Sequence, residues 1–205
     1  MAYENLPLGC DASHYQGAID FPALVAGGVG FIIIKATQGS GTDPMFDANR
    51  KGAADAGLLA FAYPFLTPDD DSDAAAHFLS VADGMVAALD WEAAGVDGGV
   101  VEMWMDACEA KANRAGLAYY GLYPPDTVSE RIASWPRWFP EYRDTPRLPP
   151  WDGVSAWDWS KEWLIWQFSG SGRAAGVTTQ IDLNRLAVPL ATLKGWHDTG
   201  TFPAP

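Results

Sequence analysis

The feature that most constrains the fold is the alternation of short apolar runs with helical patterns along residues 6–123. The clearest run, residues 31–37 (FIIIKAT), is rich in β-branched residues and typical of a strand buried on both faces of a parallel sheet. Further strand patterns cover residues 6–13, 58–66, 85–92 and 117–123. Helical patterns begin after the capping residue Asp20 and cover residues 43–56, 72–82 and 100–115. Four strand-then-helix units in series predict a parallel sheet with crossover helices.

The pattern changes after residue 123. Residues 126–135 predict a fifth helix, whereas residues 135–166 are rich in proline and hold seven of the ten tryptophans. Strand patterns return at residues 164–168 and 180–186, with a weaker one at 138–143. We therefore expect an α/β protein with an incomplete or irregular (β/α) barrel rather than an open doubly wound sheet.

Composition fits one domain and excludes some classes of function. The 205 residues, 48% of them hydrophobic, suffice for one core, which we place at about residues 6–190 of a single domain spanning 1–205. Thirteen basic residues against 26 acidic ones give a net charge of −13, which disfavours binding to nucleic acid or to an anionic membrane surface. Ten tryptophans suit stacking on sugar rings instead.

The remaining sequence signals predict a protein made in the cytosol with no export signal of its own, and we expect it to act as a monomer. Cys10 and Cys108 are too few for a disulfide framework or a metal cluster, and we expect two buried thiols. The sequence has no apolar run of about 18 residues that could span a membrane. The N-terminus shows neither the basic start nor the apolar stretch of a signal peptide.

Polar residues fall where the predicted strands end, and in a parallel barrel that end carries the functional site. Acidic residues from three separate strands would converge there, which is more specific than any one short motif. The candidates are Asp11, Lys35, Tyr63, Asp90, Glu92, Tyr123, Trp166, Gln167, Asp182 and Asn184.

Among these candidates, Asp90 and Glu92 are the pair that most directly indicates a reaction. They are two residues apart on a predicted strand, so both project to one side while Leu89 and Trp91 point into packing. Two close carboxyl groups do not ionise together easily, so one pKa should be raised. A protonated acid beside an ionised partner is what cleavage of a glycosidic bond needs.

Two simpler interpretations compete with this one. Asp-Trp-Glu can be a solvated strand end, although two further acidic strand ends and the aromatic surroundings argue against it. The carboxylates could also hold a hard cation. Because His14, His77 and His197 show no ligand spacing and no calcium-loop pattern occurs, we expect no metal and no cofactor.

Ordered motifs from residue 9 to residue 184 resemble those of the glycoside hydrolase family 25 muramidases, the Chalaropsis-type lysozymes. The resemblance begins with Gly-Cys-Asp-Ala-Ser-His-Tyr-Gln-Gly-Ala-Ile-Asp at residues 9–20 and continues through residues 31–39. It then includes Phe46, Asn49, residues 56–57, 63–65 and 89–92, Tyr123, Trp166, Gln167 and residues 180–184. It therefore covers nearly the whole chain.

The resemblance implies a fold, a reaction and a set of roles. The fold is an irregular TIM-like (β/α)5(β)3 barrel, and the reaction is hydrolysis of the β-1,4 bond between N-acetylmuramic acid and N-acetylglucosamine in peptidoglycan. Glu92 matches the general acid and Asp90 the carboxylate that assists it, with Asp11 and Asp182 as the other acidic positions. Tyr63, Tyr123 and Trp166 would shape the sugar subsite, with Gln167, Lys35 and Asn184 as further substrate-binding residues. A charged Lys35 at the end of a buried run should pair with a barrel carboxylate.

The resemblance also implies retention of configuration at the sugar. Retaining carboxyl groups lie ~5–5.5 Å apart and inverting ones ~6.5–9.5 Å apart. Alternate strand residues are ~6.6 Å apart, so side-chain tilt decides between the two. The nucleophile is either a carboxylate or the 2-acetamido oxygen of the substrate, oriented by Asp90, and we favour the acetamido oxygen.

Two positions depart from the family pattern, and two other functions stay open. Gln38 stands where the family often has an acidic residue, and Pro64 stands where a histidine is common. A barrel that binds wall glycan without cutting it is one alternative, and a hydrolase of a chitin-like polymer is the other. Residues 185–205 are too few for a wall-binding module, so a catalytic domain alone is expected. The setting we expect is a phage endolysin, or a bacterial enzyme exported by another route.

Overall fold

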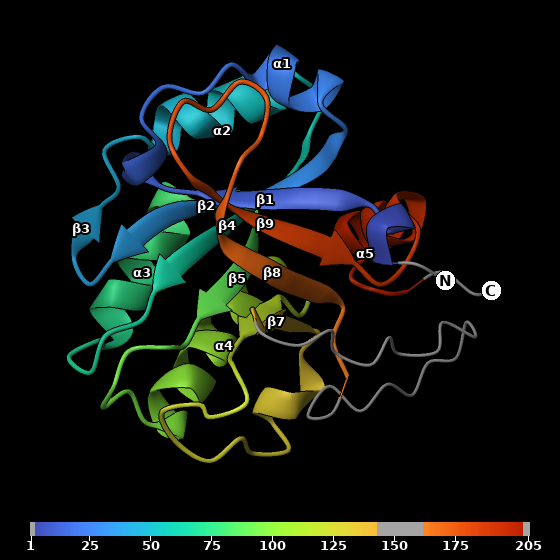
Figure 1. Cartoon of the computed structure of the whole chain (residues 1–205). Coiled ribbons are helices and arrows are strands. Elements are labelled where there is room, and N and C mark those ends of the chain that lie inside the picture. The colour runs from blue at the N-terminus through green and yellow to red at the C-terminus, as the bar shows by residue number, and fades with distance from the viewer. Residues whose placement is uncertain (1–2, 143–161, 203–205) are drawn as a thin grey trace.

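The computed structural model describes residues 3–142 and 162–202, in which eight strands close a barrel (Figure 1). The strand order is β1-β9-β8-β7-β6-β5-β4-β2-β3, and β1 also pairs with β2, which closes the ring and leaves β3 outside it. The strands are β1 (Leu8–Ala12), β2 (Val29–Gln38), β3 (Gly41–Thr42), β4 (Leu59–Phe65), β5 (Val86–Asp90), β6 (Leu117–Tyr119), β7 (Arg137–Pro140), β8 (Ile165–Gly172) and β9 (Ile181–Leu186).

Helices follow the first four parallel strands of the barrel, as the sequence pattern predicts. They are α1 (Phe21–Ala26), α2 (Phe46–Asp55), α3 (Ser72–Val81) and α4 (Gly98–Ala112), and a later helix is α5 (Leu190–Thr199). The predicted cap is confirmed, since the Asp20 carboxylate accepts a hydrogen bond from the Ala23 N–H. Asp71 and Asp97 cap α3 and α4 in the same way. Single turns of 3-10 helix are η1 (Tyr3–Asn5), η2 (His14–Gln16) and η3 (Ile132–Ser134).

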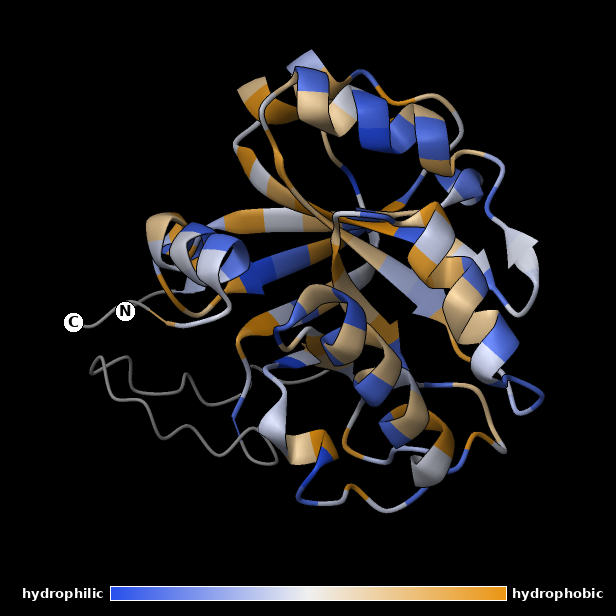
Figure 2. Ribbon diagram, turned by 180° about the vertical axis from the view of Figure 1, so that it is seen from behind, coloured by the Kyte–Doolittle hydropathy of each residue, from blue (hydrophilic) through white to orange (hydrophobic). Residues whose placement is uncertain are grey.

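Strand side chains alternate between two buried layers. Ile32 and Ile34 of β2 belong to the layer shared with residues of α1–α4, whereas Phe31 and Ile33 belong to the layer inside the barrel. On and after β5, Leu89 and Trp91 lie in the outer layer, as predicted. Figure 2 shows hydrophobic and hydrophilic residues alternating along the helices, and strands that carry hydrophobic stretches together with hydrophilic ones. The alternation places the polar residues at the strand ends over an apolar barrel interior.

The helix predicted at residues 126–135 is wrong. Only the single turn η3 forms there, with Ile132 buried in the same cluster as residues of α4. The backbone is extended at Trp135, because a residue that precedes a proline, here Pro136, is disfavoured in a helix. The strand predicted at residues 117–123 is also too long, since β6 ends at Tyr119. The weaker pattern at 138–143 does form a strand, β7, which begins at Arg137 and ends at Pro140. Three of the seven tryptophans in the rich segment lie in residues 143–161, outside the described residues.

The last part of the chain completes the barrel and closes one end of it. Strand β9 runs antiparallel to both β8 and β1. Helix α5, which the sequence analysis did not predict, follows β9 and lies at the end of the barrel opposite to where β2 and β4 point (Figure 1). Its Trp196 is buried and stacks on Phe61 of the barrel interior at a ring distance of 6.3 Å. Leu193 is buried in the same layer, so α5 covers the end of the barrel at which β2 and β4 begin.

We expect Trp196→Ala to lower the free energy of unfolding by about 3–5 kcal/mol, because it removes a large buried ring and leaves a cavity. Urea unfolding followed by tryptophan fluorescence and circular dichroism measures the change. Tyr123→Ala is the control, since that side chain is 95% exposed and its loss should leave stability nearly unchanged. Equal stability of the two variants would contradict a sealing role for α5.

Candidate active site

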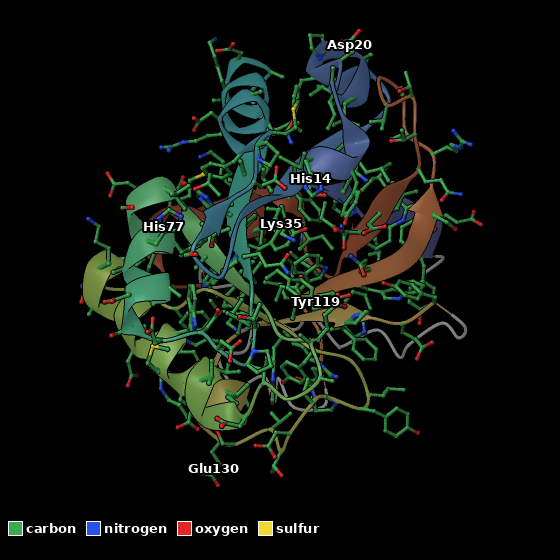
Figure 3. All side chains as sticks on the ribbon, turned by 90° about the vertical axis from the view of Figure 1, so that its left-hand side faces the viewer. His14, Asp20, Lys35, His77, Tyr119 and Glu130 are labelled. Carbon is green, nitrogen blue, oxygen red and sulfur yellow. The ribbon has the colours of Figure 1, made fainter. Side chains whose placement is uncertain are left out.

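A pocket of about 230 Å³ opens at the carboxyl ends of the parallel strands. Figure 3 looks onto this end of the barrel, with His14, Lys35 and Tyr119 over the centre of the view and Asp20, His77 and Glu130 at its periphery. The pocket is lined by the predicted residues Asp11, Lys35, Tyr63, Asp90, Glu92, Gln167 and Asp182, together with Ala12, Ser13, Tyr15, Gln16, Phe65, Tyr119, Trp138 and Tyr142. The four acidic residues that the sequence predicts to converge at this end of the barrel therefore line one pocket there.

Asp90 and Glu92 stand at different depths in the pocket. Asp90 is the last residue of β5 and is 7% exposed, whereas Glu92 lies two residues beyond it and is open to solvent. Burial raises the pKa of Asp90 well above its ordinary value, and the charge of Glu92 raises it further. Partial burial also raises the pKa of Glu92, against a hydrogen bond with Tyr119 that lowers it. Both carboxyl groups therefore hold their protons to higher pH than free side chains do.

Asp11 and Asp182 form a second carboxyl pair. They lie directly opposite each other on the antiparallel strands β1 and β9, a register that brings side chains of one face close together. Burial, and then the charge of Asp182, raises the pKa of Asp11. Burial also raises the pKa of Asp182, and a hydrogen bond with Asp11 lowers it. The pair therefore resists carrying two negative charges at once.

Two amides hold Asp11 in place. Gln167 Nε2 and Asn184 Nδ2 both donate to Asp11 Oδ2, at 2.9 and 2.7 Å. Trp138 Nε1 donates to Asn184 Oδ1 at 2.8 Å, and Tyr119 Oη donates to Gln167 Oε1 at 2.9 Å. A further donor to Gln167 Oε1 is the hydroxyl of Tyr142. Each amide thus uses its oxygen on an aromatic donor and its nitrogen on Asp11.

Lys35 differs from its prediction. Its Nζ donates to Gln38 Oε1 at 2.7 Å and lies 4.8 Å from the ring centre of Phe65. Within the described part of the chain, no carboxylate comes within ion-pair distance of this ammonium. Burial lowers the pKa of Lys35, and the charges of Asp90, Asp43 and Glu92 partly oppose that shift. The unusual Gln38 is therefore the neutral partner of a buried cation.

Three predicted substrate-binding residues do not line the pocket. Tyr123 is 95% exposed, four residues past the end of β6, and Tyr119 occupies the strand end in its place. Trp166 is buried outside the pocket, with its ring near Tyr3 and its Nε1 donating to the Glu141 carbonyl. Asn184 is fully buried and contacts the pocket only indirectly, through its hydrogen bonds to the lining residues Asp11 and Trp138. Period-two alternation along β8, which puts Gln167 inside, could have excluded Trp166.

The rim beside Asp11 is formed by the turn η2. Ser13 and Gln16 cap each other, and Gln16 Nε2 donates to the Gln180 carbonyl at 3.1 Å. His14 Nδ1 lies 2.7 Å from the buried Asp43 Oδ2. Tyr15, in contrast, is 74% exposed and lines the pocket. The turn is therefore anchored on its neighbours while it presents one aromatic ring to solvent at the mouth of the pocket.

Elsewhere in the described structure we find no comparable cluster of acidic side chains in a pocket. A larger hollow of about 480 Å³ lies among the strand beginnings, where Lys111 pairs with Asp83 at 3.2 Å. It is at the opposite end of the barrel from the carboxyl pairs. In residues 3–142 and 162–202, no group of three or more histidine, cysteine or acidic side chains could hold a metal ion. The cysteines Cys10 and Cys108 are free and buried, as predicted. No helix of these residues is long and apolar enough to cross a membrane.

Comparison with known proteins places this chain in a family. The chain matches Glycosyl hydrolases family 25 over residues 10–177. It belongs to that family. The match confirms the resemblance seen in the sequence motifs, and the family 25 chain has the irregular barrel that the resemblance implied.

Individual relatives agree with this assignment. The family 25 chain is 29% identical over 210 residues to Lysozyme M1 of Streptomyces globisporus, covering 86% of this chain and 66% of that protein. It is 27% identical over 192 residues to the autolytic lysozyme of Clostridium acetobutylicum, covering 87% and 55%. The chain therefore spans about two-thirds or less of the length of these relatives. The crystal structure of the bacterial lysozyme from Streptomyces coelicolor has the same fold, with a TM-score of 0.77 at 24% identity, covering 95% of this chain and 98% of that one.

We expect Asp90→Asn to raise the melting temperature at pH 7 by roughly 2–4 °C, the shift that about 1 kcal/mol produces in a chain of this size. A raised folded-state pKa gives stability that is present at low pH and lost as pH rises through it. The neutral amide avoids that loss, so the gain should be smaller at pH 4.

Calorimetry at pH 4 and pH 7 tests this prediction. Asp126→Asn is the control, because backbone N–H groups of Gly98 and Thr127 lower the pKa of that exposed carboxyl. Its substitution should give no gain at pH 7. A melting temperature of Asp90→Asn that is unchanged or lower at pH 7 would contradict the argument.

Proposed function

We propose that this protein is a peptidoglycan hydrolase, a lysozyme that cleaves the β-1,4 bond between N-acetylmuramic acid and N-acetylglucosamine. The observation that carries the proposal is the meeting of Asp90, Glu92, Asp11 and Asp182 in one pocket of a family 25 barrel. Paired carboxyl groups with raised pKa values suit the protonation of a glycosidic oxygen near neutral pH. The lysozyme names of two relatives support the same substrate.

Glu92 is the general acid in this proposal. It stands at the solvent-open edge of the pocket, where a polymer strand can reach it, and its raised pKa keeps a proton available. That proton passes to the bridging oxygen as the bond between this oxygen and the sugar breaks. Lys35, which faces the pocket from β2, limits how far the pKa of Glu92 rises.

Asp90 orients the nucleophile, which we propose to be the substrate's own 2-acetamido oxygen. Asp90 Oδ1 is buried and has no hydrogen-bond partner among the described residues, so it can accept the N–H of an acetamido group. The acetamido oxygen then attacks the anomeric carbon, and water later opens the resulting ring. Two successive displacements retain the configuration. Tyr63, buried beside Asp90 in the pocket, would complete the wall of this subsite.

The decisive experiment is mass spectrometry of the fragments released from purified peptidoglycan by the wild type and by Glu92→Gln. We expect fragments with N-acetylmuramic acid at the new reducing end, reduced at least about 100-fold in the variant, which loses its proton donor. Reducing ends of N-acetylglucosamine would make the protein a glucosaminidase instead. Binding without cleavage by the wild type would indicate a glycan-binding barrel, and cleavage of chitin oligomers but not peptidoglycan would indicate a chitin-type hydrolase.

Tyr15 should stack on a sugar ring at the mouth of the pocket, since its exposed ring is held there by an anchored turn. We expect Tyr15→Ala to raise KM for peptidoglycan several-fold while kcat changes little. Tyr123→Ala is the matched control, because it removes an even more exposed tyrosine that does not line the pocket. Equal KM values for the two variants would remove Tyr15 from the binding surface.

A further inference from the structure

The buried ammonium of Lys35 lies between a neutral acceptor and a carboxyl group. Three residues form one row across neighbouring strands, since Gln38 of β2 pairs in register with Phe65 of β4, and Phe65 pairs with Asp90 of β5. Lys35 Nζ lies over the middle member, 4.8 Å from the ring centre of Phe65, and donates to Gln38 Oε1 at 2.7 Å. The ammonium therefore bonds to one end of the row, while Asp90 stands at the other end.

An irregularity in β2 makes the contact between Lys35 and Gln38 possible. The two residues are three apart, so on a regular strand their side chains would project to opposite faces. The register of β2 with β4 shifts between Lys35 and Thr37, where Lys35 is opposite Tyr63 and Thr37 is opposite the next residue, Pro64. The extra residue of β2 at this point turns Gln38 to the face of Lys35, as a β-bulge does.

Asp90 offers an acceptor that the ammonium does not use. Its Oδ1 atom is buried and has no hydrogen-bond partner in any residue that the structure describes. No carboxylate oxygen of residues 3–142 or 162–202 lies within 4.0 Å of Lys35 Nζ. An ammonium and an ionised carboxylate attract each other strongly where little water screens them. The contacts that hold the ammonium elsewhere are the Gln38 oxygen and the Phe65 ring.

We propose that Gln38 is a positioning residue that holds the Lys35 ammonium over Phe65, so that Asp90 Oδ1 stays open to the substrate. Gln38 itself takes no part in bond making or breaking and acts only through Lys35. The consequence for the acetamido group rests on the function proposed above, whereas the separation of Lys35 from Asp90 does not.

A neutral acceptor at position 38 also preserves the charge of Lys35. The amide oxygen accepts one N–H of the ammonium and leaves its positive charge unchanged. That charge lowers the pKa of Asp90 and of Glu92, against the burial that raises both. Lys35 therefore acts on both carboxyl groups from a distance while neither is taken up in an ion pair.

Other titratable groups act on Asp90 or Lys35 and must stay constant in a test. They are Asp11 of β1, Tyr63 of β4, Glu92 after β5, Tyr119 of β6, Asp182 of β9 and Asp43 before α2. Replacing Gln38 with methionine removes the acceptor, keeps a side chain of similar length and leaves all of these groups in place. Gln38 is exposed, so this change should cost little stability, and melting temperatures check that the barrel is intact.

The test is a titration of the Asp90 carboxyl carbon by NMR in protein labelled with 13C at aspartate, assigned by the signal missing from Asp90→Asn. In Gln38→Met the ammonium loses its acceptor and pairs with Asp90, which favours the ionised carboxylate, so the titration midpoint should move to lower pH. In Gln38→Glu a carboxylate keeps the ammonium at position 38 and offsets its charge. The Asp90 midpoint should then move to higher pH.

Lys35→Met supplies the matched background for this test. With no ammonium to release, adding Gln38→Met to Lys35→Met should leave the Asp90 midpoint where it is in Lys35→Met alone. An unchanged or higher midpoint in Gln38→Met overturns the proposal. An equal shift in the Lys35→Met background also overturns it, because Gln38 would then act without the ammonium.

Hydrolysis of purified peptidoglycan gives a second readout. Gln38→Met should lower kcat by about tenfold or more, because Lys35 then takes the acceptor that orients the acetamido group. Gln38→Glu should not show this loss at the pH of its own maximum, and a wild-type kcat in Gln38→Met contradicts the role assigned to Gln38. If the wild type releases no fragments at any pH, the proposed function fails, while the NMR titration still decides whether Gln38 holds Lys35 away from Asp90.

Discussion

Repulsion among four carboxyl groups in one pocket is the constraint on which the rest of this structure depends. Asp11, Asp90, Glu92 and Asp182 line about 230 Å³ of space, and burial raises the pKa of each one. The charge of a neighbouring carboxylate raises the pKa further for Asp11, Asp90 and Glu92. A chain left to stability alone would not gather them, because ionised groups are costly where water is excluded. The barrel tolerates them because fixed donors take part of the charge. Asp11 receives two amide N–H groups, and Lys35 adds a buried cation that donates to the neutral Gln38.

The layers below the pocket supply the rigidity that these donors need. Phe31, Ile33 and Phe61 fill the barrel interior, and Trp196 of α5 packs beneath them. Close packing of this kind leaves strand ends little freedom to spread, so like charges stay near one another despite their repulsion. The same packing turns aromatic side chains into hydrogen-bond supports, as with Trp138, whose ring packs against Tyr119 while its N–H fixes Asn184.

Much of this arrangement could be predicted from the sequence, because it follows from the alternation of strand side chains. The run at residues 31–37 and the Asp-Trp-Glu motif fixed which side chains share a face, and the acidic residues were all found. The errors have local causes. Residues 117–123 stay apolar past the true strand end, which hid Tyr119 behind Tyr123. Helix α5 was missed because its few apolar residues are interrupted by Gly195. The contacts of Gln167 and Asn184 depend on the register of β9, which no local pattern encodes.

Because β9 is the last strand of the chain and runs antiparallel to β1, the set of carboxyl groups in the pocket is complete only when folding is complete. Asp11 belongs to the first strand and Asp182 to the last, and they face each other only when β9 is inserted between β1 and β8. Contacts so distant along the chain carry a high loop-closure entropy and form late or slowly. A partly folded barrel, with β1–β8 in place, therefore holds Asp90 and Glu92 but lacks both Asp182 and the Asn184 support of Asp11. The pocket is completed in one step, when β9 pairs with β1 and β8 and closes the barrel.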